Sequence, residues 1–190
     1  MQIARNVLRL SDLVADLVNL VTPEVRGGRP VTPLAGDDLV EAIAGRLSGE
    51  TAASLRAAPD AADRLSALAR RLRAAIVAET AADRAGEINA LLDAYRVRPY
   101  LVNDVDQPYH LHFHGSGETT VEWLGGELAT VLALTVDGYG EDRFGRCQAH
   151  HCDAVYVDTT RNGSRRYCST ACTARAKTAA YRGRRTGEGY

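Results

Sequence analysis

Cys147-Gln-Ala-His-His-Cys152 and Cys168-Ser-Thr-Ala-Cys172 are two close pairs of cysteines, separated by fifteen residues, and they contain every cysteine of the chain. Two pairs at this spacing are typical of a structural zinc site, because Zn²⁺ takes four soft ligands in a tetrahedron and each tight backbone turn supplies two. We therefore predict that all four thiolates hold one structural Zn²⁺. Two disulfides are the alternative, but they need an oxidising compartment, and we expect none because the first residues do not show the charged and apolar regions of a signal peptide.

The insert between the two pairs predicts a hairpin. Residues 154–158 are β-branched and aromatic, residues 161–163 have the turn sequence Arg-Asn-Gly, and residues 164–167 can return as a second strand. An alanine-rich helix is predicted to follow, capped by Ser169 or Thr170. The turn from Cys147 to Cys152, the hairpin and the helix together predict a treble-clef-like zinc finger. A unit this small needs its metal ion for much of its folding free energy.

The net charge of −1 hides an asymmetry along the chain. Residues 141–190 carry ten Lys or Arg and five Asp or Glu, whereas residues 1–140 carry thirteen and nineteen. Four thiolates with one Zn²⁺ would subtract two charges from the tail, which stays at about +3. This pattern predicts a polyanionic partner for the tail alone.

The remainder of the chain predicts a helical N-terminal domain over residues 1–137, followed by the finger domain over residues 138–190. Asp12 and Asp16 interrupt the first apolar segment, so we expect no membrane span, which needs about twenty nearly continuous apolar residues. Apolar spacing predicts helices near residues 4–21, 36–47, 60–77, 81–95 and 120–134, and strands at 100–102 and 109–114. Gly138-Tyr139-Gly140 is interpreted as the linker. The predicted fold class is therefore mainly α with a small β-hairpin, a helical domain plus a four-cysteine finger.

Three histidines alternate with apolar residues in the second of these strands. His110, His112 and His114 would project to the same side of it, and three histidines can hold a catalytic zinc ion. Their side chains would spread over about 13 Å, too far for one ion without bending of the strand. We therefore expect a polar, solvent-facing side of a half-buried hairpin, with a metal-dependent enzyme as a further hypothesis.

Other signs of catalysis are missing from the sequence. It contains no phosphate-binding glycine loop, no GxSxG elbow and no HExxH pair. Nothing selects two of the scattered carboxylates as an acid and a base. We expect a cytoplasmic protein that is not an enzyme.

The basic residues of the finger fall into two predicted groups. On the last helix, Arg175 and Arg182 share the side of the cysteines, where Arg175 could donate to backbone carbonyls or to a ligand sulfur. The other cations are candidates for contacts with nucleic-acid phosphates: Arg161, Arg165, Arg166, Lys177, Arg184 and Arg185. A frayed, solvated tail is the alternative for the last run of arginines.

A specific pattern runs through the finger: Tyr156-Val-Asp158-Thr-Thr-Arg161-Asn-Gly163-Ser-Arg165-Arg166-Tyr-Cys168, then Ala176-Lys177 and Tyr181-Arg182-Gly-Arg184. In order and spacing, this pattern resembles the CGNR zinc-finger family over about 40 residues. The resemblance implies an ABATE-like helical domain before the finger, which binds a ligand or mediates self-association. It also implies a stress-induced transcription regulator.

The chain departs from the family pattern in two places. The name-giving Cys-Gly-Asn-Arg reads Cys172-Thr-Ala-Arg175 here, and three residues instead of four separate Cys168 from Cys172. Neither change removes a ligand, so we expect metal binding to survive. His150 and His151, beside Cys152, could substitute as ligands, although four cysteines complete the set.

Two hypotheses for the function follow. In the first, the finger binds DNA through backbone phosphates, and the helical domain takes a small-molecule ligand or forms the homodimer that a weakly binding single finger needs. In the second, the finger is a zinc-stabilised protein-interaction module that docks on another protein or on its own helical domain. Salt-dependent DNA binding would distinguish the two.

Overall fold

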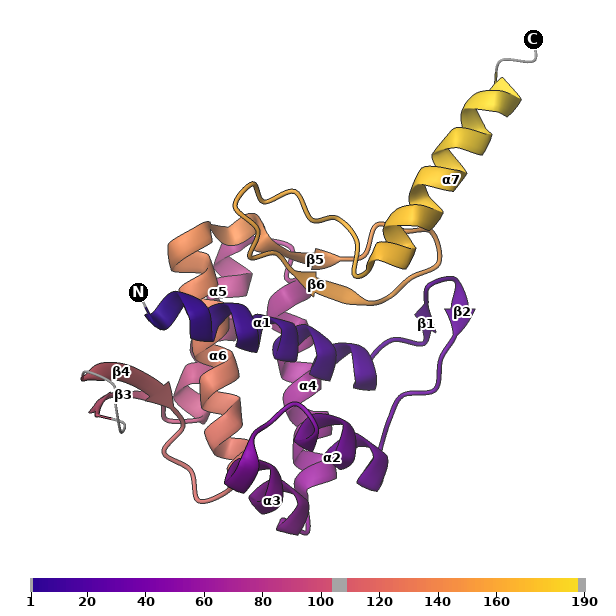
Figure 1. Ribbon diagram of the computed structural model, residues 1–190. Coiled ribbons are helices and arrows are strands. Elements are labelled where there is room, and N and C mark those ends of the chain that lie inside the picture. The colour runs from indigo at the N-terminus through magenta and orange to yellow at the C-terminus, as the bar shows by residue number, and fades with distance from the viewer. Residues whose placement is uncertain (1, 104–108, 188–190) are drawn as a thin grey trace.

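Three long helices form the centre of the molecule. The computed structural model describes residues 2–103 and 109–187, with side chains from residue 10 to residue 184. Figure 1 shows the three helices, which pack against one another: α1 (Gln2–Val21), α4 (Ala61–Val77) and α6 (Thr120–Tyr139). The predicted fold class is confirmed, since helices dominate and the strands form small antiparallel pairs.

Apolar stripes on these helices meet in one core. Leu17 of α1, Leu68 of α4 and Leu128 of α6 have no exposed surface, and burying each such side chain stabilises the fold by about 1.5–3 kcal/mol. α5 (Ala81–Ala94) packs against α4 and α6 through Leu91. The helical spacing of apolar residues therefore predicted the central helices well.

The ends of α6 are set by local chemistry. The Thr119 hydroxyl accepts from the Glu122 N–H and the Glu122 carboxylate accepts from the Thr119 N–H, which is a capping box. The helix ends at Gly140, whose φ of 95° few other residues adopt. Gly138 and Tyr139, expected in a linker, are thus helical, while the division into domains 1–137 and 138–190 stays a prediction.

The segment between α1 and α4 differs from the expectation. α2 (Gly36–Ala44) ends before Gly45, and a further short helix, α3 (Gly49–Ala57), follows that the sequence did not predict. Only Ala52 and Leu55 of α3 are buried. Two buried residues make too short a stripe for periodicity to detect.

A small hairpin lies between α1 and α2, where the sequence analysis placed no strand. β1 (Val25–Arg26) and β2 (Arg29–Pro30) pair antiparallel through Gly27 and Gly28, whose φ values of 62° and 81° are those of a two-residue hairpin turn. The Gly-Gly pair was the signal that could have predicted this turn.

The predicted hairpin of histidines forms, but with its faces exchanged. β3 (Arg98–Val102) and β4 (His110–His114) pair antiparallel. The directly opposed Leu101 and Leu111 are 65% and 43% exposed, whereas the histidines are half-buried. The expectation of a solvent-facing histidine side is therefore wrong. On that side, the His114 ring lies 6.0 Å from the ring of Trp123, which belongs to α6.

The finger begins directly after α6. A short 3-10 helix, η1 (Glu141–Arg143), leads into β5 (Phe144–Arg146), which pairs with β6 (Val155–Val157). α7 (Thr170–Gly187) then projects away from the helical body (Figure 1). Among the helices of the described residues, none combines the length and the apolar character that a membrane crossing requires.

Candidate metal centre

The first pair of cysteines sits in the loop of the β5–β6 hairpin. The Cys147 N–H donates to the Ala154 carbonyl at 2.8 Å, which closes the loop on itself. His151 has a φ of 51°, the left-handed conformation that a tight turn requires. This turn brings Cys152 back to face Cys147.

The second pair belongs to the start of α7. Cys168 precedes the helix and Cys172 lies in its first turn. The Ser169 hydroxyl accepts from the Cys172 N–H at 3.2 Å, so Ser169 caps the helix, as one of the two predicted alternatives. The positive end of the helix dipole favours thiolate at this position.

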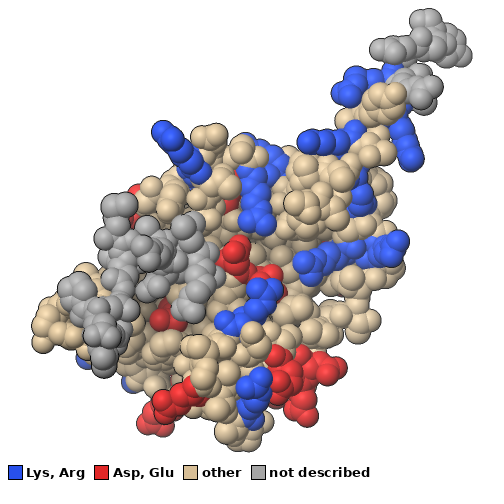
Figure 2. All heavy atoms as spheres, in the orientation of Figure 1, with Lys and Arg blue, Asp and Glu red and all other residues tan. Residues whose placement is uncertain are grey.

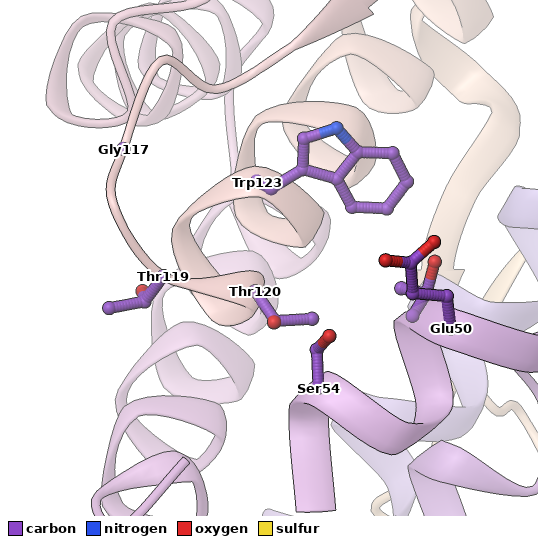
Figure 3. Close-up of a pocket in the computed structure, with 7 residues that line it drawn as sticks. Glu50, Ser54, Gly117, Thr119, Thr120 and Trp123 are labelled. Carbon is purple, nitrogen blue, oxygen red and sulfur yellow. The ribbon is translucent and has the colours of Figure 1, made fainter. Parts of the chain in front are cut away.

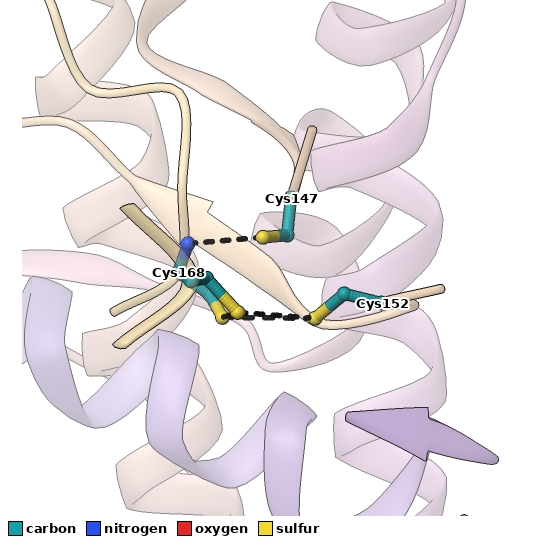
Figure 4. Close-up of side chains that lie close together, drawn as sticks. Cys147, Cys152 and Cys168 are labelled. Atoms are coloured by element: carbon teal, nitrogen blue, oxygen red, sulfur yellow. Dashed lines mark hydrogen bonds between the residues drawn. The ribbon is translucent and has the colours of Figure 1, made fainter. Parts of the chain in front are cut away.

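The four sulfurs converge on one point. The four Sγ atoms all lie within 4.8 Å of one another. Three of the separations, among Cys152, Cys168 and Cys172, are 3.7, 3.8 and 3.8 Å (Figure 4). A regular tetrahedron with metal–sulfur bonds of about 2.3 Å has edges of about 3.8 Å. All four cysteines are described and are free thiols, so the donor set and its spacing fit one structural Zn²⁺ and not two disulfides.

Four thiolates this close together need a bound cation to be stable. Burial, together with the neighbouring Cys147 and Cys152 sulfurs, raises the pKa of the Cys168 thiol, and burial raises the pKa of Cys147 as well. Four thiolates would repel one another in this partly dry site. Bound Zn²⁺ removes that repulsion and keeps the ligands deprotonated.

Hydrogen bonds to sulfur surround the cluster. The Cys168 N–H donates to Cys147 Sγ at 3.4 Å, and Arg175 Nη1 lies 3.8 Å from Cys172 Sγ. Arg175 Nη2 also donates to the His150 carbonyl at 2.8 Å. The Arg175 guanidinium therefore joins the helix to the first knuckle.

The body takes part in this site through the β1–β2 hairpin. The Gly27 N–H donates to Cys152 Sγ at 3.4 Å, and the Gly28 N–H donates to the His151 carbonyl at 2.9 Å. Val25 and Asp153 exchange two further hydrogen bonds, of 2.8 and 3.1 Å. Residues 25–28 of the N-terminal part of the chain thus form hydrogen bonds to the loop that carries Cys147 and Cys152.

A second junction lies in the core. The Asn19 side chain of α1 donates to the Val155 carbonyl at 2.9 Å and accepts from its N–H at 2.7 Å, all of it buried. Phe144, Val155 and Val157 belong to the same apolar core as the helices. In the described structure, the finger therefore docks on its own helical body.

The loop after β6 explains why the predicted hairpin is wrong. Residues 164–167 form no strand, and β6 pairs upstream with β5 instead. The buried Asp158 carboxylate accepts from the N–H and hydroxyl of Thr160 and from the Arg165 N–H, at 2.6–2.9 Å. The side chain thus supplies the acceptors that a second strand would have offered.

The candidate phosphate-contacting cations lie in different surroundings. The half-buried Arg165 donates to the carbonyls of Val157, Tyr167 and Cys168, so it stabilises the loop. Arg166 donates to two carbonyls of its own loop. The described cations exposed on the finger surface are Arg146, Arg161, Arg166, Lys177, Arg182 and Arg184, while the Arg185 side chain lies outside the described residues.

Sequence reasoning missed the residues that join the finger to the body. Asn19 was visible as a polar residue in an apolar stripe, which is the usual sign of a buried side chain with a fixed partner. Asp158 stands at the end of an apolar strand and gave a similar sign. The partner of Asn19, Val155, is far away in sequence, so that pairing was invisible, whereas Asp158 bonds to Thr160 and Arg165 of its own loop.

One comparison identifies the finger. The profile of the CGNR zinc finger family matches residues 143–185, which confirms the resemblance over this segment. Comparison with curated proteins gave no match. The chain thus carries a zinc finger with a four-cysteine site for one structural Zn²⁺.

Proposed function

We propose that the protein is a DNA-binding transcription regulator whose zinc finger presents α7 to the duplex. The supporting observation is the position of α7, which leaves the body and carries five Lys or Arg and no Asp or Glu. Figure 2 shows these cations around the projecting helix, whereas acidic side chains gather at the other end of the molecule, toward α2. This separation of charge orients the helix toward a polyanion.

The dimensions of α7 suit a DNA groove. Residues 177–184 are exposed along the whole run, and the eleven residues from 177 to 187 extend about 16 Å at 1.5 Å per residue. A helix with its side chains is about 10–12 Å wide, and the major groove of B-DNA is about 12 Å wide. Lys177 and Arg184 are seven residues apart and share one face of α7, so they would contact phosphates along the same edge of the groove.

A single finger with so few cations would bind weakly. About six phosphate contacts give an affinity that falls steeply with salt and carries little sequence information. A homodimer would bring two helices to two half-sites and raise the affinity through effective concentration. Dimerisation is therefore part of the proposal.

The helical body would supply the sensing function, in the role that an ABATE-like domain implies. A hollow of about 300 Å³ lies between α3 and the start of α6, lined by polar side chains with Trp123 at one side (Figure 3). A second hollow of about 320 Å³, lined by Arg64, Tyr95 and Glu122, shares Gly117 and Thr119 with the first. Both would suit a small polar ligand. In this proposal the protein is cytoplasmic and has no catalytic role, and stress is the condition under which it acts.

Salt-dependent DNA binding tests the proposal. Fluorescence anisotropy of a labelled 30-base-pair duplex should show affinity falling about 10³-fold between 50 and 200 mM salt if about six phosphates are contacted. The Lys177→Glu, Arg184→Glu double variant should lose binding and lower the slope of log K against log salt by about two. A matched double variant in exposed arginines of the body, Arg70→Glu with Arg98→Glu, should bind like wild type.

The alternative is a zinc-stabilised protein-interaction module. The docking of the finger on its own body supports this alternative, because the base of the finger already packs against a protein surface. Absence of DNA binding at 50 mM salt, with zinc still bound, would replace the first proposal by this one. Cys147→Ser, which removes a ligand, should abolish zinc and partner binding together in either case.

A further inference from the structure

The three histidines of β4 do not act as one group. The His114 ring stacks on Tyr100, with ring centroids 4.7 Å apart and planes 5° apart, and its Nδ1 lies 3.2 Å from the Gly115 carbonyl. It also lies near the Trp123 ring. These contacts hold His114 away from the other two, so a site of three histidines is not formed.

His110 and His112 converge instead. Residues two apart on one face of a strand are about 6.6 Å apart along it, yet the two Nε2 atoms approach to 2.8 Å. The ring centroids are 4.8 Å apart and the planes are tilted by 54°. Both side chains are half-buried, on the face of the hairpin that is turned toward α6. The strand thus brings two imidazole nitrogens close enough together to bind one ion.

The separation of these nitrogens selects a coordination geometry. An ion about 2.0–2.1 Å from each nitrogen would see them at about 85–90°, the angle between neighbouring positions of a square or an octahedron. A tetrahedral ion would require nitrogens about 3.3 Å apart. Nickel and copper take imidazole ligands and prefer the square or octahedral arrangement.

We propose that His110 and His112 form a second metal site, for a divalent transition ion of square or octahedral preference such as Ni²⁺ or Cu²⁺. The site is separate from the cysteine cluster, since the β3–β4 hairpin and the start of α7 lie on different sides of the body (Figure 1). It gives the helical body a ligand of its own. The site does not depend on the proposed function in DNA binding.

The test is a titration of the zinc-loaded, untagged full chain with Ni²⁺, which avoids the thiol oxidation that Cu²⁺ brings. Isothermal titration calorimetry should show one Ni²⁺ bound per chain, with the zinc content unchanged by mass spectrometry. His110→Gln and His112→Gln should each weaken this binding at least tenfold. His114→Gln should bind like wild type, and so should His150→Gln with His151→Gln, which changes the other neighbouring imidazole pair, whose ring centroids are 3.8 Å apart.

A measurement on the wild-type chain makes the test independent of variant folding. Paramagnetic Ni²⁺ should broaden the imidazole NMR signals of His110 and His112 before those of His150 and His151. No binding beyond the zinc, one zinc lost for each Ni²⁺ gained, binding unchanged in both single variants, or broadening first at His150 and His151 would each overturn the proposal. In those cases the close nitrogens are only a hydrogen bond.

Discussion

Replacing Asn19 by Ala should lower the melting temperature of the protein. The finger and the helical body should still unfold together, at one shared temperature. The Asn19 side chain satisfies both the N–H and the carbonyl of Val155 inside the core. Alanine removes both hydrogen bonds and leaves two buried backbone groups without this partner, at about 1–3 kcal/mol each. We expect a loss of about 3 kcal/mol, which lowers Tm by roughly 6–12 °C for a chain of this length.

Two signals must be followed together in this experiment. Circular dichroism at 222 nm reports the helices, and a chromogenic chelator reports zinc release in the same temperature scan. Because β5 and β6 share their core with α1 and α4, both signals should move down together. Asn89→Ala, at an exposed position of α5, is the matched control and should leave Tm nearly unchanged. The reasoning fails if Asn19→Ala leaves both temperatures unchanged, or lowers zinc release alone while the helices melt as before.

Three further changes test other contacts. Gly28→Ala places a side chain at φ +81°, with its Cβ against the Arg175 guanidinium. It should therefore destabilise the fold by about 1–2 kcal/mol. It should also weaken zinc retention in a chelator competition, because Arg175 is displaced. Burial alone would raise the pKa of Asp158, but hydrogen bonds from Thr160 and the Arg165 N–H outweigh it and lower that pKa; its stabilisation is therefore complete above about pH 4 and lost only as pH falls further. The difference in unfolding free energy between wild type and Asp158→Asn should accordingly stay constant from pH 8 to pH 5, and a decrease within that range would contradict the assignment. Thr119→Ala removes the α6 cap and should cost about 1 kcal/mol in urea unfolding, whereas no change in the midpoint would show that the cap is dispensable.

Features that depend on residues close together in the sequence could be predicted, whereas features that depend on distant contacts could not. The metal centre was predictable because each pair of ligands comes from one turn, so that spacing alone fixes their approach. The partner of β6 was not, since residues 164–167 and residues 144–146 were both available, and the buried Asp158 carboxylate decides between them. Alternation along β4 likewise revealed two faces without revealing which one meets α6. His114 lies near the Trp123 ring, which belongs to another element, so its surroundings could not be predicted from the strand alone.

The contacts between finger and body limit how a regulator of this build could switch. A ligand of the helical body changes DNA binding only if it binds two arrangements of the finger with unequal affinity. Val155 and Val157 are packed into the helical core and the Gly27 N–H reaches a zinc ligand, so the base of the finger moves only with α1 and the β1–β2 hairpin. Residues 177–184 of α7 are exposed and are not among the residues of this core. A switch in this protein would therefore reorient the finger through α1 or act between two copies of the chain, while the zinc site itself stays intact.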